Sequence, residues 1–186
     1  MDATTWLERA AQANQELIAG LKPADLTRPT PCWGWDVQAL INHMIGVNYF
    51  FVGALGGQTP VAGEPPDYIG QDAAAAHAES VRAALAAWRA PEAMTKSIPF
   101  GQNALPAALA VRFHLSDHVL HQWDLAKAVG REPTLDPDLV AAADATLRAN
   151  LQPAFRGPGQ GFGYEIACPD TASTLEKLVA FSGRQP

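Results

Sequence analysis

One stretch of the sequence decides the fold class and holds most of the ionisable groups of interest: FHLSDHVLHQWDLA, residues 113–126. It lies within a segment that predicts a long helix over about residues 107–129, ended by Gly130. On a helical wheel at about 100° per residue, the side that we expect to be solvated carries Arg112, Ser116, Trp123 and Lys127. The opposite side carries His114, His118, His121 and Leu125. Asp117 lies about 40° from His121, so the ionisable cluster is predicted to face the interior of a helical bundle.

This cluster has the spacing of a helical metal site. Asp117 and His121 are four residues apart, which places their Cβ atoms about 6 Å apart on one helix face. His43, within a second apolar helical stretch, is the candidate third ligand. Two imidazoles and one carboxylate with open positions for water suit a catalytic zinc, nickel or iron ion. Since buried ionisable groups also persist when they are paired, Asp117 could instead form a buried ion pair with His121 or His118.

The rest of the chain predicts further helices around this one. Capping residues and apolar spacing indicate helices from Thr5 to about Leu21 and from the N-cap Asp36 to Gly56. Three more are expected over about residues 71–90, 136–150 and 172–181, with His77 on a solvated face. We expect a loop with a short extended piece over residues 91–105 and a long irregular loop over 151–170. The predicted architecture is all-α: a single domain over residues 1–186, built as a four-helix bundle with additional short helices and a long C-terminal loop.

Composition excludes several functional classes. The chain has 13 Lys and Arg against 19 Asp and Glu, a net charge of −6, so it lacks the basic surface that binds nucleic acid. It contains no uncharged apolar run of about 18 residues, which argues against a membrane protein, and its acidic start does not resemble a signal peptide. The two cysteines, Cys32 and Cys168, are interpreted as small buried apolar residues in a cytoplasmic protein.

Three segments carry a resemblance to a known family. They read TPCWGWDV followed by LINH (residues 30–37 and 40–43), DHVLHQWDLAKAVG (residues 117–130) and LEKLVAFSGR (residues 175–184). Together they resemble the actinobacterial proteins of the DinB-like superfamily, close to the metal-binding domain of mycothiol-dependent maleylpyruvate isomerase. The resemblance implies a DinB-like four-helix bundle and a divalent metal, zinc or nickel, held by His43, Asp117 and His121. The middle position is usually Glu or His in relatives, so His118 is a substitute or supplement for the shorter Asp117.

The resemblance also implies an activity. The metal would hold a small thiol, mycothiol or another, as a thiolate that attacks a small electrophilic substrate in an isomerase or transferase reaction. Asp124 and His118 are the expected catalytic residues, orienting a ligand or moving a proton. The isomerase itself has a second, C-terminal domain that this chain is too short to contain, so maleylpyruvate is not carried over as the substrate.

Two other functional classes stay open at this point. One is a non-catalytic bundle whose metal site is vestigial, with polar residues that satisfy one another. The other is a protein that binds a small ligand, with the loop over residues 151–170 as a lid. The fold implied by the resemblance is also compatible with a homodimer.

Overall fold

The computed structural model describes residues 2–58, 66–100, 103–158 and 160–186. Its α-helices are α1 (Ala3–Ala19), α2 (Val37–Leu55), α3 (Ala73–Trp88), α4 (Ala107–Ala128), α5 (Pro137–Asn150) and α6 (Thr174–Phe181). Short 3-10 helices cover Pro23–Asp25, Ala93–Thr95 and Pro153–Phe155. Two strands, β1 (Ser97–Phe100) and β2 (Asn103–Pro106), pair antiparallel.

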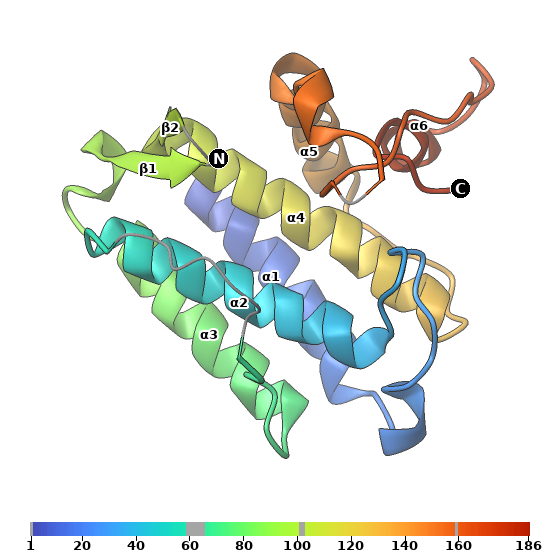
Figure 1. The fold of residues 1–186 in the computed structure, drawn as a ribbon, viewed down its shortest axis with the longest axis horizontal. Coiled ribbons are helices and arrows are strands. Elements are labelled where there is room, and N and C mark those ends of the chain that lie inside the picture. Colours follow the sequence, from blue (N-terminus) through green and yellow to red (C-terminus); the bar gives the residue numbers. More distant parts are fainter. Residues whose placement is uncertain (1, 59–65, 101–102, 159) are drawn as a thin grey trace.

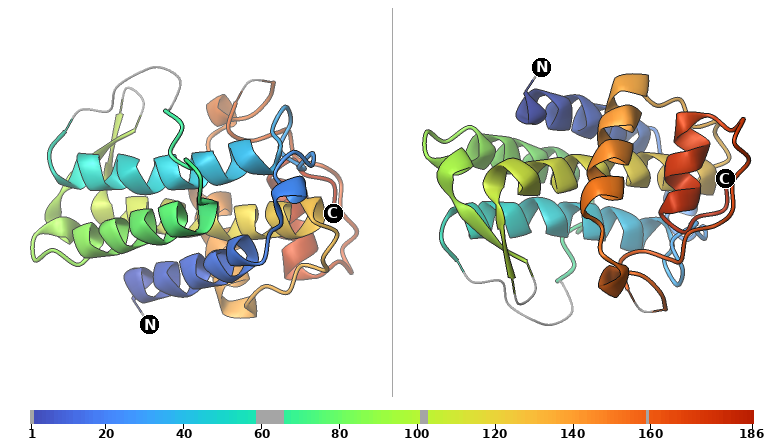
Figure 2. Two further views of the ribbon diagram at one scale, coloured as in Figure 1. Left: turned by 90° about the horizontal axis from the view of Figure 1, so that it is seen from below. Right: turned by 90° about the horizontal axis from the view of Figure 1, so that it is seen from above.

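The four long helices close into a bundle (Figure 1). Helix α1 packs against α3 and α4, and α2 packs against the same two helices. Helix α5 crosses over the outer side of α4, and α6 packs against α5 (Figure 2). This arrangement confirms the predicted all-α, DinB-like four-helix class with additional short helices.

Helix starts follow the chemistry of capping, with one difference from the sequence prediction. Asp36 caps α2 as predicted, because its carboxylate accepts a hydrogen bond from the backbone N–H of Ala39 at 2.8 Å. Helix α1 begins before Thr5, so the predicted start there was wrong. Asp2 is the cap, since its Oδ1 accepts from the backbone N–H groups of Thr4 and Thr5. An acidic side chain three residues before Thr5 thus satisfies the free N–H groups at the helix start.

Burial around α4 corrects the helical wheel. Most of its 22 residues are buried, including Ser116 at 1% exposure and Trp123 at 4%, which were expected on a solvated side. The physical reason is that α1, α2 and α5 together cover α4 around its circumference. Only the ends of that side, Arg112 and Lys127, stay exposed. Helix α4 is therefore the central element of the fold rather than an amphipathic surface helix.

His77 was also expected to be solvated and is fully buried. It lies on α3, which is flanked by α1 and α2, and the alanine-rich surroundings of His77 let these helices approach closely. The expected extended piece over residues 91–105 is the hairpin β1–β2, whose buried Ile98 caps the apolar core at that end of the bundle.

The opposite end of the bundle gathers segments that are far apart in sequence. The loop between α1 and α2 and the C-terminal tail after α6 lie together there, beside the last turns of α4 (Figures 1 and 2). A contact between Cys32 of the loop and Arg184 of the tail joins them. Among the described helices, none combines the length and apolarity needed to cross a bilayer.

Candidate metal centre

The three predicted ligands converge between α2 and α4. Oδ1 of Asp117 lies 3.2 Å from Nε2 of His43 and 3.2 Å from Nε2 of His121. One ligand atom from each residue lies within 4.8 Å of the other two. Asp117 and His121 stand one helical turn apart on α4, as their spacing predicts, while the packing of α2 on α4 supplies His43. We call these three residues the triad.

Asp117 provides a test of whether a cation suits the triad. Its second carboxylate oxygen, Oδ2, is buried and has no hydrogen-bond partner in the described part of the chain. A buried, unpartnered carboxylate oxygen is costly, and a bound cation would offset that cost. Two imidazole nitrogens and a carboxylate also form a usual donor set for zinc or nickel. The residues present therefore fit a divalent ion.

The electrostatics of the triad favour a positive charge at this point. Burial acts to raise the pKa of Asp117, but His121 and His43 lower it, and the net pKa lies well below its ordinary value. Burial acts to lower the pKa of His121, but Asp117, Asp124 and Cys32 raise it, and the net pKa lies well above its ordinary value. The carboxylate is thus anionic and attracts either a proton on His121 or a metal cation.

One side of the triad reaches solvent. The side chains of His43 and Asp117 are 33% and 21% exposed, whereas that of His121 is 8% exposed. Trp35, from the loop before α2, packs its ring 4.7 Å from the ring of His43 and 6.3 Å from that of His121. The neighbouring Trp33 is 92% exposed. The partly exposed side of His43 and Asp117 therefore lies beside the ring of Trp35.

A second cluster surrounds the other ring nitrogen of His121. Oδ2 of Asp124 lies 2.9 Å from Nδ1 of His121 and accepts from Sγ of Cys32 at 3.1 Å. Arg184 donates to both oxygens of Asp124, from Nε at 2.7 Å and from Nη2 at 2.8 Å. Asp124 was a predicted site residue, and the structure places it directly behind His121.

Sequence reasoning missed the roles of Cys32 and Arg184 in this cluster. Cys32 was interpreted as a buried apolar residue, but it is half-buried and its sulfur contacts polar groups. Arg184 stood only within the third resembling segment. No periodicity links it to Asp124, because the contact spans 60 residues of chain. Its place near the triad could have been inferred only from the resemblance.

The second cluster offers Cys32, His121 and Asp124 as a further donor set, but its charge argues against a metal. The guanidinium of Arg184 already neutralises Asp124, and its Nη2 lies 3.5 Å from Sγ of Cys32. A cation bound there would be repelled by this fixed charge. Burial raises the pKa of Asp124, but Arg184 and His121 lower it to about 2. The triad is therefore the better candidate for a metal site.

His118, predicted as a catalytic residue or alternative ligand, is not brought to the triad. Asn14 donates from Nδ2 to its Nδ1 at 3.2 Å, so its proton lies on Nε2, which is 3.2 Å from Oδ1 of Asn48. His114 is held in the same way: Trp88 donates to its Nδ1 at 3.0 Å, and its Nε2 lies 2.8 Å from the same Asn48 oxygen. Both imidazoles belong to a polar network in the bundle core.

His77 extends this core network toward α1. Its Nδ1 lies 2.7 Å from Oε1 of Gln15, which identifies Nδ1 as the protonated nitrogen. Burial lowers the pKa of His77 to about 4. It also lowers the pKa of His114 to about 4, against a raising effect of Asp117, and that of His118 well below its ordinary value. All three are neutral near pH 7, unlike His121.

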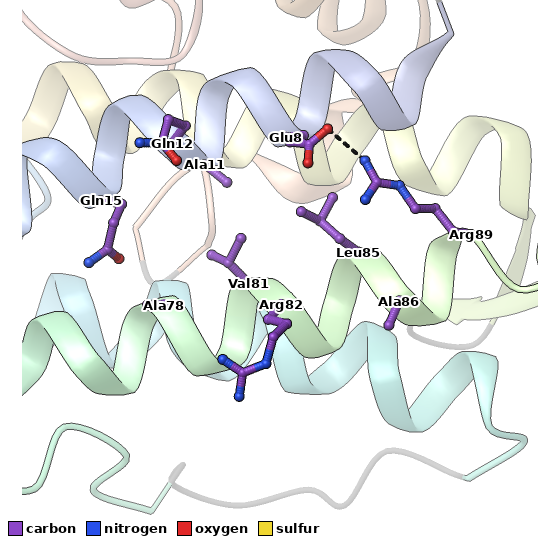
Figure 3. Close-up of a pocket in the computed structure, with 10 residues that line it drawn as sticks. All are labelled: Glu8, Ala11, Gln12, Gln15, Ala78, Val81, Arg82, Leu85, Ala86 and Arg89. Atoms are coloured by element: carbon purple, nitrogen blue, oxygen red, sulfur yellow. Dashed lines mark hydrogen bonds and ion pairs between the residues drawn. The ribbon is translucent and has the colours of Figure 1, made fainter.

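A groove of about 400 Å³ lies between α1 and α3, the two long helices that supply no member of the triad (Figure 3). Its floor includes Ala11, Val81 and Leu85, and an ion pair between Glu8 and Arg89 crosses its rim. These residues are apolar or paired with each other. The groove therefore holds no cluster that would do chemistry, and the triad is the better candidate site.

Comparison with known proteins places the chain in a family. A family model described as the mycothiol maleylpyruvate isomerase N-terminal domain matches residues 7–126. Two uncharacterised proteins of Mycobacterium tuberculosis, from strains CDC 1551 / Oshkosh and H37Rv, are each 33% identical over 184 residues, or 99% of this chain and 98% of theirs.

Two crystal structures of mycothiol-dependent maleylpyruvate isomerase share the fold. One is of a histidine-to-alanine mutant, with a TM-score of 0.66, and the other has a TM-score of 0.62. Both are 17% identical in sequence, over 87% of this chain and 72% of theirs. The family match and the full-length relatives, together with this fold, lead to one conclusion: the chain belongs to the family of the mycothiol maleylpyruvate isomerase N-terminal domain.

Proposed function

We propose that the chain is a divalent-metal-dependent enzyme that activates a small thiol for attack on a small electrophile, as an isomerase or transferase. One observation carries this proposal: Oδ1 of Asp117 lies 3.2 Å from an imidazole nitrogen of both His43 and His121, while its Oδ2 is buried without a partner. The family adds a thiol to the proposal, because the solved relatives are named as mycothiol-dependent isomerases.

Each residue of the site has a role in this proposal. His43, Asp117 and His121 would hold zinc or nickel, and the bound ion would supply Lewis acidity and lower the pKa of a thiol. Asp124 fixes the ring of His121 by accepting from its Nδ1. The thiol and the electrophile would approach from the solvent-exposed side of His43 and Asp117, against the ring of Trp35.

Asp124 has the better geometry of the two proposed catalytic residues. Its carboxylate touches a triad ring directly, so it can orient that ring. Both ring nitrogens of His118 are engaged by core asparagines, so neither is free to transfer a proton at the triad.

The first test is the metal content of the protein. Elemental analysis of untagged protein, as purified and after loading with zinc or nickel and desalting, should find close to one ion per chain. The variants His43→Ala and His121→Ala should lose it, because each removes one of three ligands. His77→Gln is the matched control, since His77 contacts no member of the triad, and circular dichroism verifies that each variant is folded.

The second arm of the same test concerns the thiol. Metal-loaded protein should consume a small electrophile only when mycothiol or another low-molecular-weight thiol is supplied, and the metal-free triad variants should not. Retention of no ion after any loading would overturn the proposal and favour a bundle with a vestigial site. A rise in melting temperature with thiol, but without turnover, would instead indicate a ligand-binding protein.

A further inference from the structure

Arg184 is a buried charged residue in the C-terminal tail after α6. Its side chain is 9% exposed, and it binds Asp124, which is fully buried, through two parallel hydrogen bonds. A third nitrogen, Nη1, donates to Oγ of Ser182 at 3.1 Å. A forked contact of this kind fixes both the position and the plane of a carboxylate, which one hydrogen bond does not.

The backbone before Arg184 has a conformation that only glycine accepts. Gly183 has a φ of +88°, and a Cβ atom there would lie 2.4 Å from Cα of Gly163. The N–H of Gly163 also donates to the carbonyl of Ser182 at 3.2 Å. Two backbone segments thus touch directly, and this contact directs Arg184 inward, toward α4.

The contacts of Arg184 continue through Asp124 to the triad. The Asp124 oxygen that accepts from Nη2 of Arg184 also lies 2.9 Å from Nδ1 of His121. When a cation replaces the proton on Nε2, the proton that Nδ1 shares with Asp124 keeps the lone pair of Nε2 directed into the triad, where Oδ1 of Asp117 lies 3.2 Å away. We propose that Arg184 is a positioning residue for the candidate metal centre: it locks the Asp124 carboxylate, which in turn holds His121 with Nε2 directed at the metal. This inference rests on the proposed function of the triad.

Removal of Arg184 would release that lock. Asp124 would become a buried carboxylate without its compensating charge, free to rotate or to draw in water. The ring of His121 would then lose its fixed orientation. Replacement of a partner behind a metal ligand typically weakens metal affinity about 10- to 100-fold.

The test is a comparison of four variants by zinc affinity. Arg184→Met and Asp124→Asn should each weaken zinc binding about 10- to 100-fold relative to the unaltered protein. Arg184→Lys keeps the charge but not the fork, so it should recover only part of the affinity. The double variant should bind zinc no more weakly than Asp124→Asn alone, because Arg184 acts through Asp124.

A spectroscopic signature separates positioning from general damage to the fold. Cobalt(II) bound in place of zinc should show altered ligand-field absorption in Arg184→Met. The matched control is Arg148→Met, because Arg148 packs over the ring of Phe181 at the end of α6 and pairs with Asp144 rather than with Asp124. It should leave both zinc affinity and the cobalt spectrum unchanged.

A metal-independent measurement keeps this inference distinct from the proposed function. A proton held between His121 and Asp124 should give a slowly exchanging, far-downfield proton resonance, assigned by its absence in His121→Ala and lost in Arg184→Met. Zinc binding by Arg184→Met equal to that of the unaltered protein would overturn the inference and leave the proposed function standing. If the unaltered protein binds no metal, the proposed function fails. In that case, persistence of the resonance in Arg184→Met would also overturn the positioning role of Arg184.

Discussion

His121 is held at both of its ring nitrogens, each by a different carboxylate. Nε2 faces Asp117 and Nδ1 faces Asp124, and the two contacts leave the imidazole little freedom to rotate. His118, three residues earlier on the same helix, is held just as firmly but by neutral amides. Two histidines one turn apart therefore have different chemical surroundings, one anionic and one neutral.

This difference predicts that substitution of His118 lowers the stability of the protein without changing its metal content. His118→Leu removes two side-chain hydrogen bonds and leaves one N–H of the Asn14 amide without its partner in the core, although that amide still donates to the backbone carbonyl of residue 118. The free energy of unfolding should fall by about 2–4 kcal/mol. Metal content should not change. Urea unfolding and elemental analysis of the same preparation measure both quantities. A stable variant that has lost its metal would instead return His118 to the ligand set.

At the scale of elements, the C-terminal tail depends on two glycines. Gly183→Ala would place a methyl group 2.4 Å from Cα of Gly163 and impose a positive φ on alanine. We expect a loss of about 2–4 kcal/mol in the free energy of unfolding, together with weaker metal binding.

The matched control for this substitution is Gly57→Ala. Gly57 has a similar φ of +80°, but no atom of the described residues beyond its chain neighbours lies within 4 Å of the added Cβ. The variant Gly57→Ala therefore has the strain of a positive φ without a steric clash, and its free energy of unfolding should fall by about 1 kcal/mol. Chemical denaturation compares the two variants. Equal losses would show that the contact with Gly163 does not constrain the tail.

Helix α4 shows how far sequence reasoning reached at this scale. The spacing of Asp117 and His121 predicted their shared face correctly, because an i, i+4 relation is fixed by helical geometry. Periodicity could not reveal that Ser116 and Trp123 are buried, since that depends on α5 covering the outer side of α4. Capping chemistry was equally local, which is why Asp36 was recognised.

Long-range contacts set the limit of prediction for the site. His43 could be proposed as a ligand because it interrupts an apolar stretch and because the family resemblance supported it. The contact of Arg184 with Asp124 depends on the path of the tail past Gly163, which no local pattern encodes. The sequence shows the three core histidines, but their amide partners, Asn14, Gln15 and Asn48, lie on other helices and were not anticipated.

At the scale of the whole molecule, the bundle encloses ionisable groups of opposite behaviour. His77 and His114 are buried with pKa values of about 4, because burial disfavours their charged forms. In the unfolded chain they would titrate near 6.5. His121 behaves in the opposite way, since its carboxylate neighbours raise its pKa. The buried His77 and His114 should therefore lower the stability as the pH falls, whereas His121 should lower it as the pH rises.

The metal-free protein should lose stability as the pH falls from about 6.5 to about 4. In that window the unfolded chain takes up protons on His77 and His114 while the folded chain does not, so unfolding is favoured. The loss should be on the order of 3 kcal/mol for each histidine. Asp124 adds little there, because its contribution to stability is lost mainly as the pH falls from the ordinary value of 3.8 toward its lowered pKa of about 2.

Urea unfolding at a series of pH values measures this dependence. The variant His77→Gln should flatten the slope by the share of one histidine, because glutamine does not titrate. A stability that stays constant from pH 6.5 to 4 would mean that the core histidines take up protons without unfolding. The paired group His121 should act above that window, where stability declines as the pH rises through its elevated pKa.

The core network also bears on proton conduction through the bundle. A hydrogen-bonded wire carries protons only if each member can accept one and pass it onward. Oδ1 of Asn48 receives hydrogen bonds from both His114 and His118, so two short chains end on the same amide oxygen. The amide cannot relay a proton from one imidazole to the other. The core network therefore offers no proton path to the candidate metal centre on that side, whereas the solvent-facing side of His43 and Asp117 is open to proton exchange.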